Sequence, residues 1–392
     1  MKGGGKLEDQ LFEECREGNM ELAMALVDRG ANVNAVDDIG NTPLHYVCIN
    51  GNSGLVMALV ERGANIEAPN INQSVPLHVA CEYGQLIIVS FLLDRGANIE
   101  AIDTHQFTPL LYASGNNNVE TVGELLNRGA DVHVIDEEEN TPLHWACISN
   151  SHRLMLQYIL ESGADVNVIN IHQDTPLHYV CTRGNIGLAK VLMLYDADPN
   201  IRNNNQMTSL HYACINGNYE LVKLLLDNGA DINAITNQQV TPLHYSSYYG
   251  YLEVTMALLD SGADVNVRDE NGYTPLHDAC RGDNKDIALA LVDRGADLNA
   301  RDVFQKMPLD YVNDSIRQEL NHMVQSKVEN TMSSLVDRAE LRGTVHETAG
   351  NPYLTSRLSR LPDVLLDQVN SYNGGKCKTK KRKTRRHKTR KH

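Results

Sequence analysis

The stretch TPLHYVCING, residues 42–51, returns with small changes as TPLHYVCTRG from Thr175 and as TSLHYACING from Thr208. Looser copies begin at Val75, Thr108, Thr141, Thr241, Thr274 and Met307. Successive copies are 33 residues apart, except for one step of 34. A second column keeps the same period, with Gly-Ala at Gly30, Gly63, Gly96, Gly129, Gly163, Gly229, Gly262 and Gly295, and Asp196 in the same column. Because two independent columns share one period, the chain is a repeat array.

Local chemistry predicts a pair of helices in each repeat. Thr42 is a good N-cap because its hydroxyl can accept from a free backbone amide, and Pro43 suits the first helical position. Gly51 ends the first helix and Gly63 ends the second. The buried face of the first helix consists of Leu44, Val47 and Cys48. One such pair cannot bury its own apolar face, so the pairs must stack.

These repeats resemble the ankyrin repeat family in their period, in TPLHYVC and its copies, and in GANVNA or GADINA after the second helix. The resemblance implies an all-α solenoid of about ten stacked units over residues 7–322, each a helix pair with a β-hairpin finger. Residues 7–39 and 307–322 are the expected capping units.

The repeats depart from the family pattern in two ways, and each predicts a local change of structure. Most copies lack the usual Gly two residues before the Thr, and we expect reshaped finger turns there because a Cβ disfavours positive φ. The residues concerned are Gln73, Gln106, Gln173, Gln206, Gln239 and Gln305. The unit at Thr141 carries one extra residue, which we place in the turn near 149–152 and expect to disturb stacking.

Seven of the nine copies hold a His, and most hold a Cys three residues later, which raises the question of a metal or catalytic site. Each unit offers at most one His and one Cys, whereas a metal needs several ligands that converge on one ion. The resemblance implies that the His ties down the Thr-Pro turn, and the Cys column fits small core thiols. The chain contains no nucleotide-binding or catalytic motif at working spacing, so we predict no enzyme activity, no metal site and no cofactor.

Charge is distributed unevenly. The chain holds 35 Lys and Arg against 50 Asp and Glu, yet residues 376–392 hold 11 of the basic residues and no acid. The tail contains Lys380, Lys381, Arg382, Lys383, Arg385 and Arg386. This composition predicts disorder and resembles a nuclear localisation signal that importin would bind; a nucleic-acid tether and a solvated end are the alternatives. The acidic run DEEEN from Asp136 is either a solvated loop or a docking site for a basic partner.

No apolar run is long enough to span a membrane and no secretory signal is visible, so we expect an intracellular protein, cytoplasmic or nuclear. Cysteines in one repeat column are too far apart for routine bridging, which favours reduced thiols.

Residues 323–375 differ in composition and include a stripe that resembles the first helix of an F-box, as in poxvirus ankyrin proteins. Its residues are Leu361, Pro362, Leu365, Leu366 and Val369. An F-box-like stripe predicts ubiquitin-ligase components as partners. The alternative is a helix that packs on the solenoid or lies free in solution.

One residue of TPLHYVCING does not face the core on a helical wheel, because Tyr46 lies almost opposite Leu44. We call this position the aromatic column; its aromatic members are Tyr46, Tyr112, Trp145, Tyr179, Tyr212, Tyr245 and Tyr311, and Val79 and Asp278 interrupt it. The resemblance implies that this position faces a concave groove. We therefore predict a non-enzymatic scaffold for a protein partner of unknown identity, bordered by Phe107, Met207 and Tyr273. The near-copies and basic tail also resemble ankyrin proteins of large DNA viruses, which would place the protein in a host cell.

Overall fold

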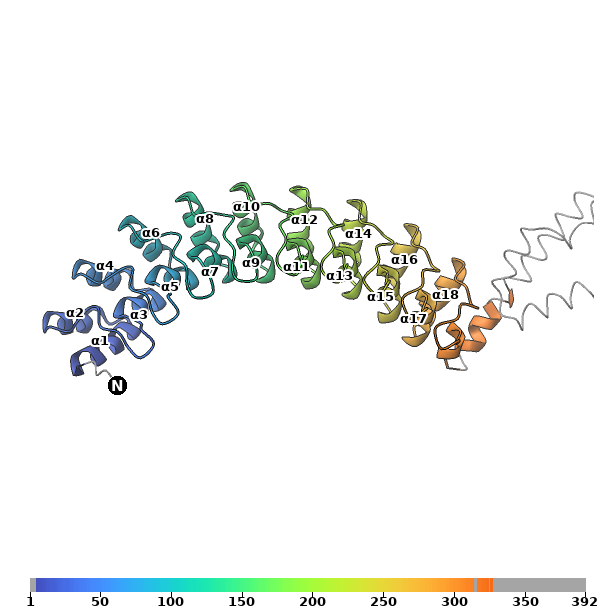
Figure 1. Cartoon of the computed structure of the whole chain (residues 1–392), viewed down its shortest axis with the longest axis horizontal. Helices are drawn as coiled ribbons and strands as arrows, with labels where there is room; N and C mark the ends of the chain where they lie inside the picture. The colour runs from blue at the N-terminus through green and yellow to red at the C-terminus, as the bar shows by residue number, and fades with distance from the viewer. Residues whose placement is uncertain (1–4, 314–315, 324, 327–392) are drawn as a thin grey trace, which may run out of the picture. The chain divides into compact units, whose positions relative to one another are not determined.

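In the computed structural model, which describes residues 5–313, 316–323 and 325–326, the chain forms helices that follow one another in pairs (Figure 1). The elements are α1 (Lys6–Glu17), α2 (Met20–Asp28), α3 (Pro43–Asn50), α4 (Ser53–Glu61), α5 (Pro76–Glu82), α6 (Leu86–Asp94), α7 (Pro109–Gly115), α8 (Val119–Asn127), α9 (Pro142–Ile148), α10 (Arg153–Glu161), α11 (Pro176–Arg183), α12 (Ile186–Leu194), α13 (Ser209–Ile215), α14 (Tyr219–Asp227), α15 (Pro242–Tyr249), α16 (Leu252–Asp260), α17 (Pro275–Arg281), α18 (Lys285–Asp293) and the 3₁₀ helix η1 (Pro308–Tyr311). Each pair coincides with one copy of the sequence repeat. The F-box-like stripe and the basic tail lie outside the described residues.

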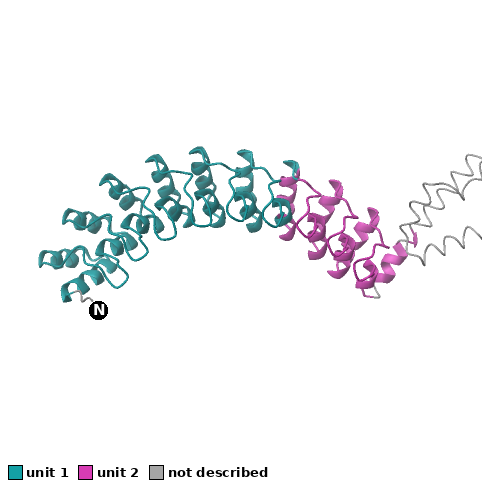
Figure 2. Ribbon diagram, viewed as in Figure 1, with its two compact units in different colours: residues 1–212, 227–230 teal, residues 213–226, 231–392 magenta. Residues whose placement is uncertain are grey.

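Two compact units divide the chain (Figure 2). Unit 1 comprises residues 1–212 and 227–230, and unit 2 comprises residues 213–226 and 231 onward. Within unit 1 the first helices of the pairs, α1, α3, α5, α7, α9 and α11, contact one another in sequence order, and so do the second helices, α2 to α12. In unit 2 the same pattern joins α15 to α17 and α16 to α18. A two-layered helical stack is therefore the architecture of each unit.

The first helices start and end as the sequence predicts. The Thr141 hydroxyl accepts a hydrogen bond from the His144 amide at the start of α9, and Pro142 fills the first helical position. Gly51 follows α3 with φ of 83°, the left-handed conformation that favours glycine. The predicted core face is fully buried, with Leu44, Val47 and Cys48 all at 0% exposure.

Each finger, the loop between one pair and the next, is organised by a single polar side chain, which we call the pivot. In the finger before α7 the pivot is Asp103, whose Oδ1 accepts from the amides of His105 at 2.8 Å and Phe107 at 2.9 Å. Asp37, Asn70, Asp136, Asn170, Asn203, Thr236, Asp269 and Asp302 repeat this arrangement. No strand occurs among the residues that the structure describes, so the predicted β-hairpins are not confirmed.

The expectation of reshaped finger turns is wrong. Gln106 adopts φ of 61° where Gly40 adopts 77° and Gly272 adopts 76°, so the glutamine keeps the same left-handed turn. Gln73, Gln173, Gln206, Gln239 and Gln305, together with Glu139, do likewise. The physical reason is that the two amide bonds to the pivot fix the loop, and this outweighs the cost of a left-handed residue with a Cβ.

The extra residue of the unit at Thr141 lies where the sequence predicts, in the loop 149–152 between α9 and α10. Asn150 takes φ of 55° there, and Ser149 Oγ donates to the Gly115 carbonyl of the preceding pair at 2.5 Å. α10 still contacts both α8 and α12. The expected disturbance of stacking is therefore absorbed by the loop.

The seven cysteines of the repeat column are free and buried, as the sequence predicts for core thiols. Burial raises the pKa of Cys15 to about 12, because a thiolate is disfavoured away from water, and it also raises the pKa of Cys48, Cys81, Cys147, Cys181 and Cys280. None of the described helices has the length and hydropathy needed to cross a bilayer.

Candidate partner-binding surface

The aromatic members of the column are half-buried in the structure. Six of these rings form a hydrogen bond with the pivot nine residues earlier in the sequence. Tyr112 donates to Asp103 Oδ2 at 2.7 Å, and the indole nitrogen of Trp145 donates to Asp136 Oδ2 at 2.9 Å. Where the pivot is an amide the direction reverses, so that Asn170 Nδ2 donates to the Tyr179 hydroxyl at 2.9 Å. The same pairing joins Tyr46 to Asp37, Tyr212 to Asn203, and Tyr311 to Asp302.

The rings also cover the histidines of the preceding repeat. The centroids of Tyr112 and His78 are 5.7 Å apart in an edge-to-face arrangement, and those of Tyr179 and His144 are 6.1 Å apart. Burial and the neighbouring Asp103 carboxylate raise the pKa of Tyr112. The ring position therefore makes hydrogen bonds and ring contacts within the fold, although it lies opposite the core face on a helical wheel.

Three of the predicted surface residues form a cluster in unit 1. Phe107, from the finger, lies 5.1 Å from Tyr112 and 5.3 Å from Trp145, centroid to centroid. Among the other predicted residues, Met207 and Tyr245 are half-buried, and Tyr273 contacts Tyr311 at 5.9 Å between centroids in unit 2. Phe107 thus lies beside the rings of Tyr112 and Trp145, and Tyr273 occupies the equivalent finger position in its own unit.

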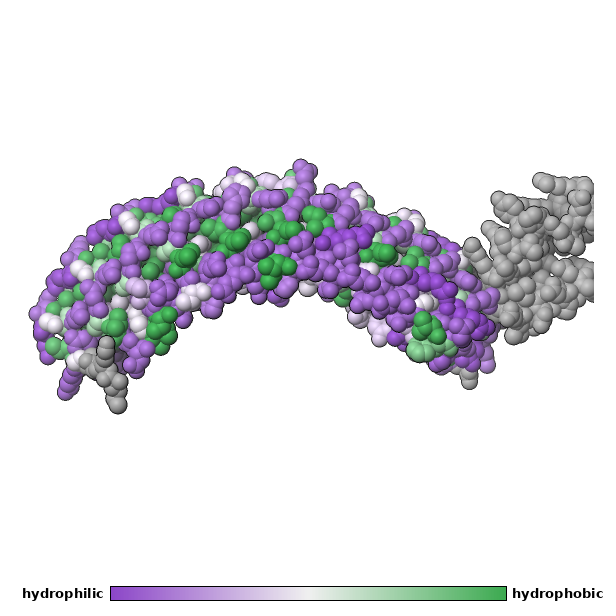
Figure 3. All heavy atoms as spheres, viewed as in Figure 1, coloured by the Kyte–Doolittle hydropathy of each residue, from purple (hydrophilic) through white to green (hydrophobic). Residues whose placement is uncertain are grey.

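Sequence reasoning missed a second column, which we call the finger row. It consists of four of the six residues that immediately precede a pivot in unit 1, where the side chain points to solvent: Val36, Ile102, Ile135 and Ile169, exposed by 58%, 60%, 45% and 38%. Pro69 and Arg202 occupy the other two positions. The pivots Asp103, Asp136 and Asn170 are buried, and so is Ala101 on the other side of Ile102, so the segment alternates between inside and outside. Aliphatic residues recurring at one position of a loop were the available signal. Figure 3 shows apolar side chains as separate patches on an otherwise hydrophilic surface.

The histidine column is structural. In α9 the Nδ1 of His144 accepts from the Thr141 amide at 3.2 Å, and Nε2 lies 3.0 Å from the Asp174 carbonyl of the next finger. This pattern requires a neutral ring with the proton on Nε2. Burial lowers the pKa of His144 to about 4, because the charged ring would lose its hydration. The part of the chain that the structure describes contains no group of three His, Cys, Asp or Glu side chains that could hold a metal.

The acidic run after α8 divides between two roles. Asp136 is 5% exposed and serves as a pivot, whereas Glu137, Glu138 and Glu139 are exposed. The run lies in the finger between α8 and α9, and its first residue, Asp136, is buried and not solvated. The three glutamates flank Ile135 and give this part of the finger row an acidic border.

Comparison with known proteins identifies the class. A family model described as ankyrin repeats (3 copies) matches residues 11–103, 100–170, 155–236 and 233–302, which together cover well over half of the chain. The chain therefore belongs to the ankyrin repeat proteins, which generally mediate protein–protein interaction and are typically non-enzymatic. No curated protein matches it.

Proposed function

We propose that the chain is a non-enzymatic scaffold that binds a protein partner across unit 1, in the groove that the family resemblance implies. The binding surface comprises the finger row and the exposed faces of the aromatic column, centred on Ile102, Ile135 and the Phe107–Trp145 cluster. The single observation that supports it most is the finger row, because aliphatic side chains exposed by about half recur at four fingers and leave apolar surface in contact with water.

The aromatic column supports the proposal through its rigidity. Each ring held by its pivot has one orientation before any partner arrives, so binding loses less side-chain entropy than it would with free rings. Tyr and Trp are also enriched among residues that dominate binding energy. A partner that covers the finger row would therefore meet aromatic groups already in place.

Charge substitutions in the finger row test this proposal without removing a structural group. The double variant I102E/I135E places two carboxylates on a surface that is already acidic, and both side chains are solvent-exposed, so folding should be retained. We expect capture of the cognate partner from the native host to fall by about tenfold or more. The matched control is Leu194→Glu on α12, because Leu194 is 81% exposed but lies outside the finger row.

A second candidate function is a substrate-recruiting adaptor of a cullin-type ubiquitin ligase. It rests on the F-box-like sequence around Leu361 and Pro362, which lies outside the described residues. In this case the full chain should co-purify with cullin components, and changing Leu361 and Leu365 to Asp should abolish that. A wild-type capture without any cullin component contradicts the adaptor.

The basic tail, from Lys376 onward, is proposed as a nuclear localisation signal, with nucleic-acid binding as its alternative. Deleting residues 376–392 should lower the nuclear signal if importin binds the tail. It should instead lower salt-sensitive nucleic-acid retention if phosphates do. Cytoplasmic or nuclear residence and a large-DNA-virus origin are proposals from sequence alone.

A further inference from the structure

The aromatic column is interrupted in unit 2 by a buried acid. Asp278, in α17, occupies the ring position and is 8% exposed. Its pivot, Asp269, accepts from the amides of Asn271 at 2.9 Å and Tyr273 at 2.7 Å through Oδ1. An ionised carboxylate cannot donate to the pivot as Tyr and Trp do elsewhere, so this repeat brings two acids together.

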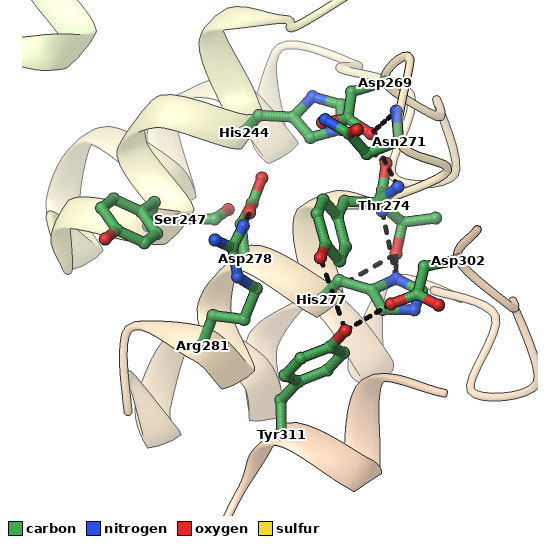
Figure 4. A network of polar contacts seen from close by, with 12 residues as sticks. His244, Ser247, Asp269, Asn271, Thr274, His277, Asp278, Arg281, Asp302 and Tyr311 are labelled. Carbon is green, nitrogen blue, oxygen red and sulfur yellow. Dashed lines mark hydrogen bonds and ion pairs between the residues drawn. The ribbon is translucent and has the colours of Figure 1, made fainter. Parts of the chain in front are cut away.

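This acid is poorly compensated by its surroundings. Burial raises the pKa of Asp278 to about 7, although the neighbouring Arg281 lowers it, and Asp269 adds to the rise. The Ser247 hydroxyl, fully buried in α15, makes no hydrogen bond and is directed toward Asp278 (Figure 4). The site therefore contains a buried carboxyl group and a buried hydroxyl, and Arg281 leaves the hydroxyl without a hydrogen bond.

Arg281 lies in this site as a cation between aromatic rings. Its Nη1 donates to Asp278 Oδ1 at 3.1 Å. Its guanidinium carbon lies 4.4 Å from the ring centroid of Tyr273 and 5.7 Å from that of Tyr248, which is 44% exposed. A carboxylate combined with aromatic faces is an arrangement that binds organic cations.

We propose that Asp278, Tyr248 and Tyr273 form a recognition site for a cationic side chain, arginine or lysine, of a bound protein, and that Arg281 occupies this site in the free chain. Arg281 is the last residue of α17 and its side chain is 37% exposed, so it can leave without breaking a helical turn. The origin of the cation in a protein partner rests on the proposed function; the site itself does not.

Small cations can test the site without the partner. Methylguanidinium represents arginine, methylammonium represents lysine, and urea is a neutral planar control. The variant Arg281→Ala removes the internal cation, and R281A/D278N also removes the carboxylate with little change of shape. Binding of each probe to the full chain is measured by saturation-transfer NMR at millimolar concentrations.

We expect saturable binding of one or both cations to R281A, about tenfold tighter than to the wild type and lost in R281A/D278N. The stronger of the two cations identifies the side chain recognised. Equal binding to R281A and the wild type, equal binding to R281A and R281A/D278N, or binding of urea as strong as that of the cations, overturns the proposal. Arg281→Ser is the second variant, and circular dichroism must show native helicity in each protein that is compared.

Discussion

Substituting Asp136 by Asn tests the pairing of pivots with rings. An amide has one acceptor oxygen, whereas Asp136 uses one oxygen for the amides of Glu138 and Asn140 and the other for the Trp145 indole at 2.9 Å. The indole can only donate, so an asparagine here must leave either the finger amides or the indole without an acceptor. We expect the free energy of unfolding to fall by about 1.5–3 kcal/mol, the value of one hydrogen bond to a charged group.

The matched control is Asp103→Asn. Its ring partner, Tyr112, can accept as well as donate, and Tyr179 already accepts from Asn170 in the same chain at 2.9 Å. The Tyr112 hydroxyl can therefore reverse its role, and we expect a loss below about 1 kcal/mol. The double variant D136N/W145Y should recover most of the loss for the same reason.

The assay is urea unfolding of the full chain, followed by far-UV circular dichroism for all variants. Trp145 is the only tryptophan in the sequence, so its fluorescence reports on this repeat wherever it is retained. Equal losses for D136N and D103N, or no recovery in the double variant, would refute the donor–acceptor argument for the pivots.

Three further outcomes follow from the packing. Leu177→Ala should lower the free energy of unfolding by about 2–5 kcal/mol because it leaves a cavity in a fully packed core, and Cys181→Ala should lower it by about 1 kcal/mol. Equally large losses for both variants that zinc restores would contradict the assignment of Cys181 as a core thiol. Since burial lowers the pKa of His144 to about 4, the unfolded chain binds protons first, and stability should fall as the pH drops from about 6.5 toward 4, by about 3 kcal/mol for this residue. An unfolding midpoint that is flat over that range in urea titrations would oppose it. Gly40→Ala should destabilise by about 1–3 kcal/mol, because its Cβ would lie 2.9 Å from a backbone nitrogen at positive φ. Gln106→Gly, by contrast, should leave stability unchanged or raise it by up to about 1 kcal/mol, and urea unfolding of both variants measures the difference.

The sequence was sufficient for the repeat itself. Period, caps and the apolar face of the first helix are local properties, so Thr141, Pro142 and Gly51 could be assigned from their neighbours alone. The position of the extra residue near Asn150 also follows from counting. The histidine role came from the family resemblance, and the structure confirms it through both ring nitrogens of His144.

The candidate surface was harder to predict, because it depends on the path of loops. The bond between Trp145 and Asp136 joins residues nine apart across a finger, which no helical wheel represents. The two amide bonds to the pivot Asp103 explain why Gln106 tolerates a left-handed conformation that its Cβ disfavours. The exposure of Ile102 likewise follows from the alternation of a loop whose register is set by its pivot, Asp103.

The central claim is that unit 1 binds a protein through its finger row, and quantitative affinity capture with the full chain tests it most directly. Wild type, I102E/I135E and L194E are immobilised at equal amounts and exposed to lysate of the native host, and captured proteins are quantified by mass spectrometry. We predict a protein retained equally by wild type and L194E, and reduced about tenfold or more by I102E/I135E. Equal retention by all three correctly folded proteins would contradict the claim.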